Sequence, residues 1–169
     1  AGEDEAAMEA VVAALKGKDD VMRAAALTVV AGGGLPGDVS KHVVTCLQDK
    51  NPIVRANAIR ALPTLDLPVK QTVAKLVDML GDAETEVRAV ALQVLGTRYA
   101  ESNKSAGKAV IRALRDPAPQ VRMNALSLVR RMGPEVEGAG DAVAALLNDP
   151  DPMVRAEAVS ALPELGTPD

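Results

Sequence analysis

One pair of side chains in this sequence has the types and spacing of a reactive centre. His42 and Cys46 lie four residues apart, so on a helix both side chains would share one face. Such a pair could act as a nucleophile with its general base, or as two ligands of a metal ion. The chain has no other histidine or cysteine, and no further ligand or orienting carboxylate is evident nearby. We therefore favour a packing role for Cys46, and expect no catalytic residue, no metal site and no cofactor.

A second candidate is a run of cations in residues 102–134, where seven lysines and arginines face a single aspartate. Four of the cations follow steps of four, four and three, which places them on one helix face: Lys104, Lys108, Arg112 and Arg115. This stripe could bind an acidic partner, a phosphate backbone or the acidic residues 135–169 of another copy. We favour a solvated face, because charged residues on helices are usually exposed to water.

The composition excludes several classes of function. The 169 residues include one Tyr and neither Phe nor Trp, so no aromatic platform can stack single-stranded nucleic acid. The net charge of -4 gives no general attraction to nucleic acid, which we do not expect as a partner. No apolar run approaches the roughly 20 residues of a membrane-spanning helix, so we expect no membrane insertion. The acidic N-terminus lacks the basic start of a signal peptide, yet Ala1 could follow a cleavage site, and the compartment stays open between cytoplasmic and exported.

A motif recurs five times along the chain, and it dictates the organisation. A Val-Arg pair (Met-Arg in the first copy) is followed by Ala and an aliphatic residue. The arginines lie 32, 33, 34 and 33 residues apart: Arg23, Arg55, Arg88, Arg122 and Arg155. Ahead of the last four pairs, a Leu-x-Asp string supplies an aspartate: Asp49, Asp82, Asp116 and Asp149. The first copy has Gly17 at that position. Such a period is the signature of a repeat architecture.

Each copy predicts two helices. Apolar residues three and four positions before the repeated leucine form one stripe of a first helix. A second helix begins after the aspartate, where Asn51-Pro52 and Asp151-Pro152 combine an N-cap residue with proline at the first helical position. No alternation typical of strands appears.

A lone hairpin of about 33 residues cannot bury its own apolar stripe, so the copies must stack. We expect an all-α fold, a right-handed α-solenoid of five two-helix repeats with about ten helices. The chain would then be a single domain, residues 1–169, with repeats at about 1–35, 36–67, 68–101, 102–134 and 135–169.

The string Leu-x-Asp-x-x-x-x-Val-Arg-x-x-Ala, followed by Leu, Ile or Val, resembles the HEAT repeat in its short phycobilisome-lyase-like form. The resemblance covers nearly the whole chain. It implies a ladder between neighbouring repeats, formed by the four aspartates and the last four arginines: Asp49, Asp82, Asp116 and Asp149 with Arg55, Arg88, Arg122 and Arg155. Gly17 puts the link of the first repeat in question. It implies no particular function, because HEAT repeats serve many unrelated roles.

Second helices of HEAT arrays usually line a concave surface, and the resemblance implies that their exposed residues bind a partner. Positions two, five and nine after each arginine should be exposed, and they include these residues: Asn57, Arg60, Val90, Gln93, Asn124, Ser127, Arg131, Glu157 and Ser160. Arg60 and Arg131 are the best single candidates, because arginine is enriched among interface hot spots.

The last repeat lacks a polar cap. An open apolar surface is expected there, at Val143, Leu147, Val159 and Leu162. It suggests a fragment of a longer array, or a face that a partner or a second copy covers by end-to-end association.

We therefore predict a non-catalytic protein–protein interaction scaffold or adaptor that binds a protein along the concave face. One alternative is an accessory or substrate-presenting module of an enzyme system, as in the lyase-like relatives. The other is weak phosphate-backbone binding through the basic residues 102–134.

Overall fold

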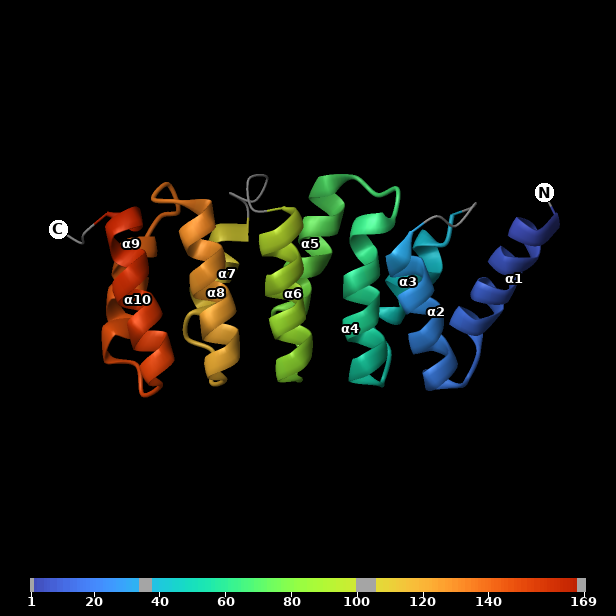
Figure 1. Ribbon diagram of the computed structural model, residues 1–169, viewed down its shortest axis with the longest axis horizontal. Coiled ribbons are helices and arrows are strands. Elements are labelled where there is room, and N and C mark those ends of the chain that lie inside the picture. The colour runs from blue at the N-terminus through green and yellow to red at the C-terminus, as the bar shows by residue number, and fades with distance from the viewer. Residues whose placement is uncertain (1, 34–37, 100–105, 167–169) are drawn as a thin grey trace. The chain divides into compact units, whose positions relative to one another are not determined.

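The computed structural model describes residues 2–33, 38–99 and 106–166, and the regular secondary structure of this part of the chain is all helical (Figure 1). It contains ten α-helices and no strand, which confirms the all-α class and the two helices of each repeat. The helices are α1 (Gly2–Lys16), α2 (Asp20–Gly32), α3 (Ser40–Cys46), α4 (Pro52–Ala61), α5 (Val69–Met79), α6 (Thr85–Arg98), α7 (Gly107–Ala113), α8 (Pro119–Met132), α9 (Ala139–Ala145) and α10 (Pro152–Leu165). Short 3₁₀ turns follow α4 (η1, Leu62–Thr64) and α9 (η4, Leu146–Asn148).

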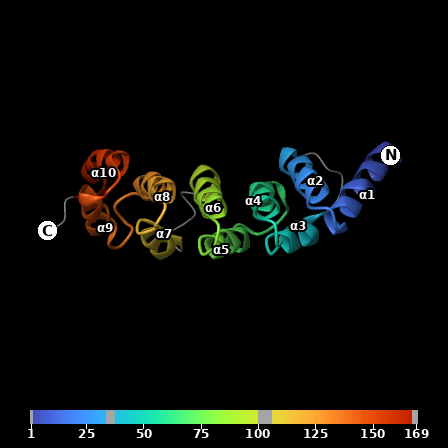
Figure 2. The same cartoon turned by 90° about the horizontal axis from the view of Figure 1, so that it is seen from below.

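The chain divides into two compact units, Ala1–Thr72 and Val73–Asp169, with the boundary inside α5. Within each unit the second helices of the hairpins form one layer and the first helices another, except that α1 slants beside α2 (Figure 2). In the first unit α2 packs against α4 and α1 against α3; in the second, α8 packs between α6 and α10. Hairpins thus bury their apolar stripes against one another, which is the packing of an α-solenoid.

The core is aliphatic, and its positions repeat with the sequence. The residue four positions after the repeat arginine is buried in the first four copies: Leu27, Ile59, Leu92 and Leu126. The small residue one position earlier is also buried in all five: Ala26, Ala58, Ala91, Ala125 and Ala158. These alanines let neighbouring helices approach closely, so the core needs no aromatic ring. None of the helices in the described ranges has both the length and the apolar character needed to cross a bilayer.

The expected helix starts are confirmed. The Asn51 side chain accepts a hydrogen bond from the Ile53 N–H at 2.9 Å, and Asp151 accepts one from the Met153 N–H at 2.8 Å. Asp19 has the same role ahead of α2. Each cap satisfies N–H groups that the first helical turn leaves without partners.

The expectation of an open apolar surface at the last repeat is partly wrong. Val143 is completely buried, because α9 packs against α10. Leu162 is half-buried. Leu147 and Val159 are exposed as expected, with 39% and 61% of their surface open to solvent.

Candidate protein-binding groove

Buried arginine–aspartate pairs hold neighbouring hairpins in register. In three pairs, Nε and Nη2 of an arginine both donate to the carboxylate of the next repeat. The distances are 2.7 and 3.2 Å for Arg23–Asp49, 2.7 and 2.9 Å for Arg88–Asp116, and 2.8 and 2.6 Å for Arg122–Asp149. These are bidentate, charge-assisted bonds, and their geometry fixes how one hairpin sits on the next. The ladder is therefore a structural device within each unit.

The first repeat does have its ladder link, contrary to the doubt that Gly17 raised. Arg23 binds Asp49 of the second repeat and needs only the backbone carbonyl of Gly17, to which its Nη1 donates at 2.9 Å. In the same way, Nη1 of Arg122 donates to the carbonyl of Asp116. Each aspartate of the three pairs binds the arginine of the repeat before it. The first repeat can therefore have Gly17 in place of an aspartate and still keep the Arg23–Asp49 pair.

The ladder aspartates are held in their ionised form. Burial by itself would raise the pKa of Asp49, Asp116 and Asp149. Hydrogen bonds from the arginine and from a loop N–H lower the pKa by more than burial raises it. The loop N–H belongs to the residue two positions on, as in the 2.9 Å bond from Asp151 to Asp149. The net result for each of the three carboxyl groups is a pKa below its usual value.

Two asparagines predicted to bind a partner also join second helices to each other. Nδ2 of Asn57 donates to the carbonyl of Ala24 at 3.1 Å, and Nδ2 of Asn124 donates to the carbonyl of Ala89 at 3.1 Å. Their amide oxygens accept from neighbours on their own helices: Arg60 donates to Asn57, and Gln120 donates to Asn124. Both asparagines thus have a structural role, and a ligand would have to share their amide groups.

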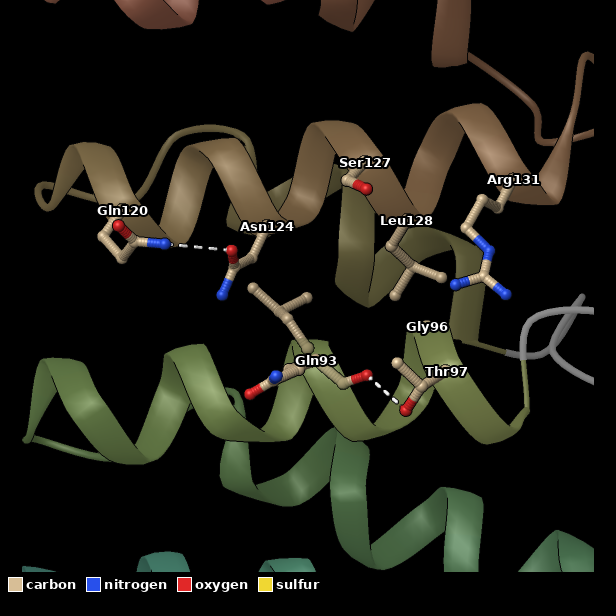
Figure 3. Close-up of a pocket in the computed structure, with 9 residues that line it drawn as sticks. Gln93, Gly96, Thr97, Gln120, Asn124, Ser127, Leu128 and Arg131 are labelled. Carbon is tan, nitrogen blue, oxygen red and sulfur yellow. Dashed lines mark hydrogen bonds between the residues drawn. The ribbon is translucent and has the colours of Figure 1, made fainter.

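A groove of about 240 Å³ lies between α6 and α8 in the second unit. Its polar lining comes from Gln93 and Thr97 on α6 and from Gln120, Asn124, Ser127 and Arg131 on α8 (Figure 3). Leu92, Gly96 and Leu128 supply the apolar part. The groove brings together four of the predicted partner-binding residues: Gln93, Asn124, Ser127 and Arg131.

Three of these groove side chains carry spare hydrogen-bonding capacity. Gln93, Ser127 and Arg131 are exposed, and within the described residues no hydrogen bond or ion pair engages their side chains. Arg131 is the one cation among the lining residues, and none of them is a carboxylate. The groove therefore presents a row of amide and hydroxyl groups with a positive charge at one end.

Sequence reasoning missed two of the polar residues that line the groove. Thr97 lies nine positions after Arg88, so the spacing that selects Arg131 also selects it. Gln120 lies two positions before Arg122, in the first turn of α8, and the pattern contained no signal for it.

The remaining second-helix candidates lie elsewhere. Asn57 and Arg60 are on α4 in the first unit, where they contact each other. Ser160 is exposed on α10. Val90, expected to be exposed, is buried. Glu157 forms an ion pair with Arg130 of α8 at 2.9 Å.

The cationic stripe lies in the layer of first helices. Lys108, Arg112 and Arg115 are exposed in and just after α7, while Lys104 lies outside the described residues. Arg112 borders a depression of about 300 Å³ between α5 and α7, which also contains Asp78 and Asp116. The stripe thus belongs to a surface of mixed charge, on the layer that does not form the groove.

The burial of Cys46 argues against a reactive pair with His42. Cys46 is buried, and this burial, with a smaller contribution from the Asp49 charge, raises the pKa of its thiol. A buried thiol of raised pKa is a poor nucleophile and a poor metal ligand. Within the described ranges, no three His, Cys, Asp or Glu residues gather where they could hold a metal ion.

Comparison with known proteins places the fold. The model of the family described as HEAT repeats matches residues 8–96 and 108–169. The chain is similar to a designed armadillo repeat protein in complex with the peptide (KR)4, with a TM-score of 0.70 and 18% identity over 92% of this chain and 80% of that one. It is also similar to Cex1p, with a TM-score of 0.71 and 17% identity over 92% of this chain and 34% of that one.

A third similar structure is the complex of CpcE and CpcF of phycocyanin lyase from Nostoc sp. PCC7120. The TM-score is 0.67 and the identity 22%, over 92% of this chain and 98% of that one. Among curated proteins, none matches this chain. At these identities, the likenesses concern the fold alone.

Proposed function

This chain belongs to the HEAT repeat family, and on that basis we propose that it is a non-catalytic scaffold that binds an extended segment of a partner protein. The observation that carries the proposal is the groove between α6 and α8, with its uncommitted side chains Gln93, Ser127 and Arg131. Armadillo-like relatives support this mode of binding, because a designed armadillo repeat protein of similar fold is known in complex with a peptide.

The chemistry of the groove suits main-chain recognition. Gln93 can both donate and accept hydrogen bonds, and so can Ser127, which matches the N–H and C=O groups of an extended peptide. The Asn124–Ala89 bond keeps α6 and α8 at a fixed spacing, so the groove is formed before the ligand arrives. Binding would then need little reorganisation.

The charge of the groove favours an acidic segment. The guanidinium of Arg131 is a planar donor that pairs well with a carboxylate, and no lining carboxylate competes for it. The peptide (KR)4 bound by the designed relative is cationic, whereas the positive charge of Arg131 favours a ligand of the opposite charge in this groove. With few large anchors in the groove, we expect affinities on the order of micromolar.

Selection from a random peptide library tests the proposal. The wild-type chain should enrich peptides with Asp or Glu at one position, and Arg131→Glu should abolish that preference while helicity stays unchanged. Arg115→Glu is the matched control, because it reverses an exposed arginine of the same unit in the other layer. Arg60→Glu tests whether the binding surface extends to α4.

Two outcomes would refute the proposal. If Arg131→Glu and Arg115→Glu select the same peptides as the wild-type chain, Arg131 does not recognise the ligand. If the wild-type chain selects no peptide at all, the groove is not a peptide-binding site.

A further inference from the structure

A glycine inside a helix lines the groove between α6 and α8. Gly96 lies two residues before the end of α6 and is buried. Glycine within a helix is less stable than alanine, because fixing its backbone removes more conformational freedom. Two structural reasons can make a glycine necessary all the same: a positive φ angle, or a neighbouring atom too close for a Cβ.

Neither structural reason applies to Gly96. Among the described glycines, a positive φ occurs only at residues that cap helices. A Cβ built on Gly96 would lie 3.8 Å from Leu128 Cδ1 and 4.0 Å from Arg131 Nη1, which are ordinary contact distances. The backbone and the packing around residue 96 could therefore accept alanine.

The repeat does not require glycine at this position either. Gly96 lies eight positions after Arg88, and the equivalent residue of every other copy has a side chain: Ala31, Pro63, Arg130 and Pro163. Stacking of one hairpin on the next is thus compatible with a Cβ here. The reason for glycine must be sought in what is particular to α6 and α8.

What is particular is the cation beside Gly96. Arg131 and Leu128 extend from α8 towards the turn of α6 that contains Gly96 (Figure 3). Arg131 is exposed, and no hydrogen bond or ion pair within the described ranges engages its guanidinium. Because residue 96 has no side chain, Nη1 of Arg131 can be approached across α6. A methyl group at 4.0 Å would fill part of the space through which an acceptor oxygen comes within about 3 Å of that nitrogen.

We propose that Gly96 is a specificity-determining residue of the groove, because its missing side chain lets an acidic side chain of the ligand reach Arg131. The methylene groups of a ligand Asp or Glu lie across the bare turn of α6, beside Leu128, and the carboxylate pairs with the guanidinium. This inference rests on the proposed function, since it assigns the route by which the acidic segment is recognised.

A methyl group at residue 96 should then change stability and binding in opposite directions. Gly96→Ala would stabilise α6 and would weaken the contact with a carboxylate. Substitutions that stabilise a protein at a binding site commonly reduce its function in this way. A glycine with no role in binding would show only the gain in stability.

Fluorescence anisotropy tests the effect on binding. The probe is a labelled short peptide of alternating Gly and Glu, and a second peptide with Gln in place of Glu measures what remains without the charge. The wild-type chain should bind the Glu peptide more tightly than the Gln peptide. Gly96→Ala should bind the Glu peptide about tenfold more weakly, since a charge-assisted hydrogen bond is impaired. Its affinity for the Gln peptide should stay within about twofold of the wild-type value, and its melting temperature should not fall.

Two further variants separate the proposed role from a general change in shape. Gly32→Ala is the matched control, because it adds the same methyl group at the last residue of α2, where no atom of the described residues lies within 4 Å of the built Cβ. It should bind both peptides as the wild-type chain does. In an Arg131→Gln background, Gly96→Ala should have no further effect on the Glu peptide, because the two substitutions act on one contact.

Given a wild-type chain that prefers the Glu peptide, four results would overturn the inference and leave the proposed function standing. Gly96→Ala could bind the Glu peptide as tightly as the wild-type chain, or lose the same factor in affinity for both peptides. It could act equally with and without Arg131, or melt at a lower temperature than the wild-type chain. A wild-type chain that binds the two peptides equally would instead remove the acidic preference of the groove, and the role of Gly96 with it.

Discussion

Removing the charge of Asp149 should weaken the packing of the last hairpin far more than removing the charge of Glu157. Both carboxylates accept from arginines of α8, so each pair joins the same two hairpins. They differ in burial. The side chains of Arg122 and Asp149 are 9% and 4% exposed, whereas those of Arg130 and Glu157 are 37% and 29% exposed. Asp149→Asn and Glu157→Gln are thus nearly isosteric changes at buried and open ends of one interface.

The expected loss of stability depends on the hydrogen-bond acceptors that Arg122 retains in Asp149→Asn. Breaking a buried ion pair by removing one partner typically costs about 3–5 kcal/mol, because the other charge is left uncompensated. Arg122 retains two carbonyl acceptors, those of Asp116 at 2.8 Å and Pro117 at 3.0 Å, and the amide oxygen introduced by the substitution can still accept one hydrogen bond. We therefore expect a smaller cost than this, about 2–3 kcal/mol, for Asp149→Asn. An exposed pair contributes about 0–1 kcal/mol, so Glu157→Gln should cost less than about 1 kcal/mol.

Urea unfolding followed by far-ultraviolet circular dichroism measures both values. Because hairpins of a repeat protein can unfold separately, hydrogen exchange of the α10 amides should accompany it. Asp149→Asn should accelerate exchange in α10, and Glu157→Gln should leave it nearly unchanged. Equal changes in the free energy of unfolding for the two variants would refute the claim that burial determines how much a ladder pair stabilises the fold. A small effect of Asp149→Asn alone would mean that the carbonyl acceptors suffice for Arg122.

Two further predictions concern pH and packing. The pKa values of Asp49, Asp116 and Asp149 are lowered in the folded chain, so their stabilisation is complete above the unfolded value of about 3.9 and is lost as the pH falls through the folded values. The urea midpoint should stay level from about pH 7 to 5 and fall below about pH 4, less steeply in Asp149→Asn; an identical slope in that variant would contradict the assignment. Gly96→Ala should stabilise α6 by up to about 1 kcal/mol, since its Cβ would meet Leu128 Cδ1 at an ordinary 3.8 Å. In a thermal melt Gly107→Ala should gain less, because its Cβ would lie 3.1 Å from Val136 Cγ1, and an equal gain would show that packing is irrelevant at both sites.

Much of the fold and part of the groove could be predicted from the spacing of a few residues. The period of the Val-Arg motif identifies equivalent positions, and equivalent positions share an environment because each hairpin stacks in the same way. Cys46 was correctly expected to be buried, since its counterparts are packing residues. The offsets from Arg122 likewise selected three residues of the groove: Asn124, Ser127 and Arg131.

Contacts between repeats were beyond the reach of the pattern. The period could not show that Arg23 pairs with Asp49, one repeat further on, and so it cast doubt on a link that Gly17 does not affect. Nor could it show that Asn124 spans to the carbonyl of Ala89, which makes the amide part of the scaffold as well as of the groove. Gln120 joins the groove only through the approach of α6 to α8.

The string Ala-Leu-Pro shows the difference between what the sequence and the packed structure determine. It occurs twice, and the helix that contains it ends differently at the two places. At Ala61 the α-helix stops and a 3₁₀ turn follows, where the Thr64 hydroxyl contacts the carbonyls of Ala61 at 2.8 Å and of Val30, on α2, at 3.0 Å. At Ala161 the helix continues through Pro163, with Glu164 3.5 Å from Arg130 of α8. The repeat, its helices and its caps depend on local spacing, so the order of residues alone was enough to predict them. The helix ends, the ladder partners and the groove depend instead on which atoms the neighbouring hairpin brings within hydrogen-bonding distance, and only the packed structure shows these.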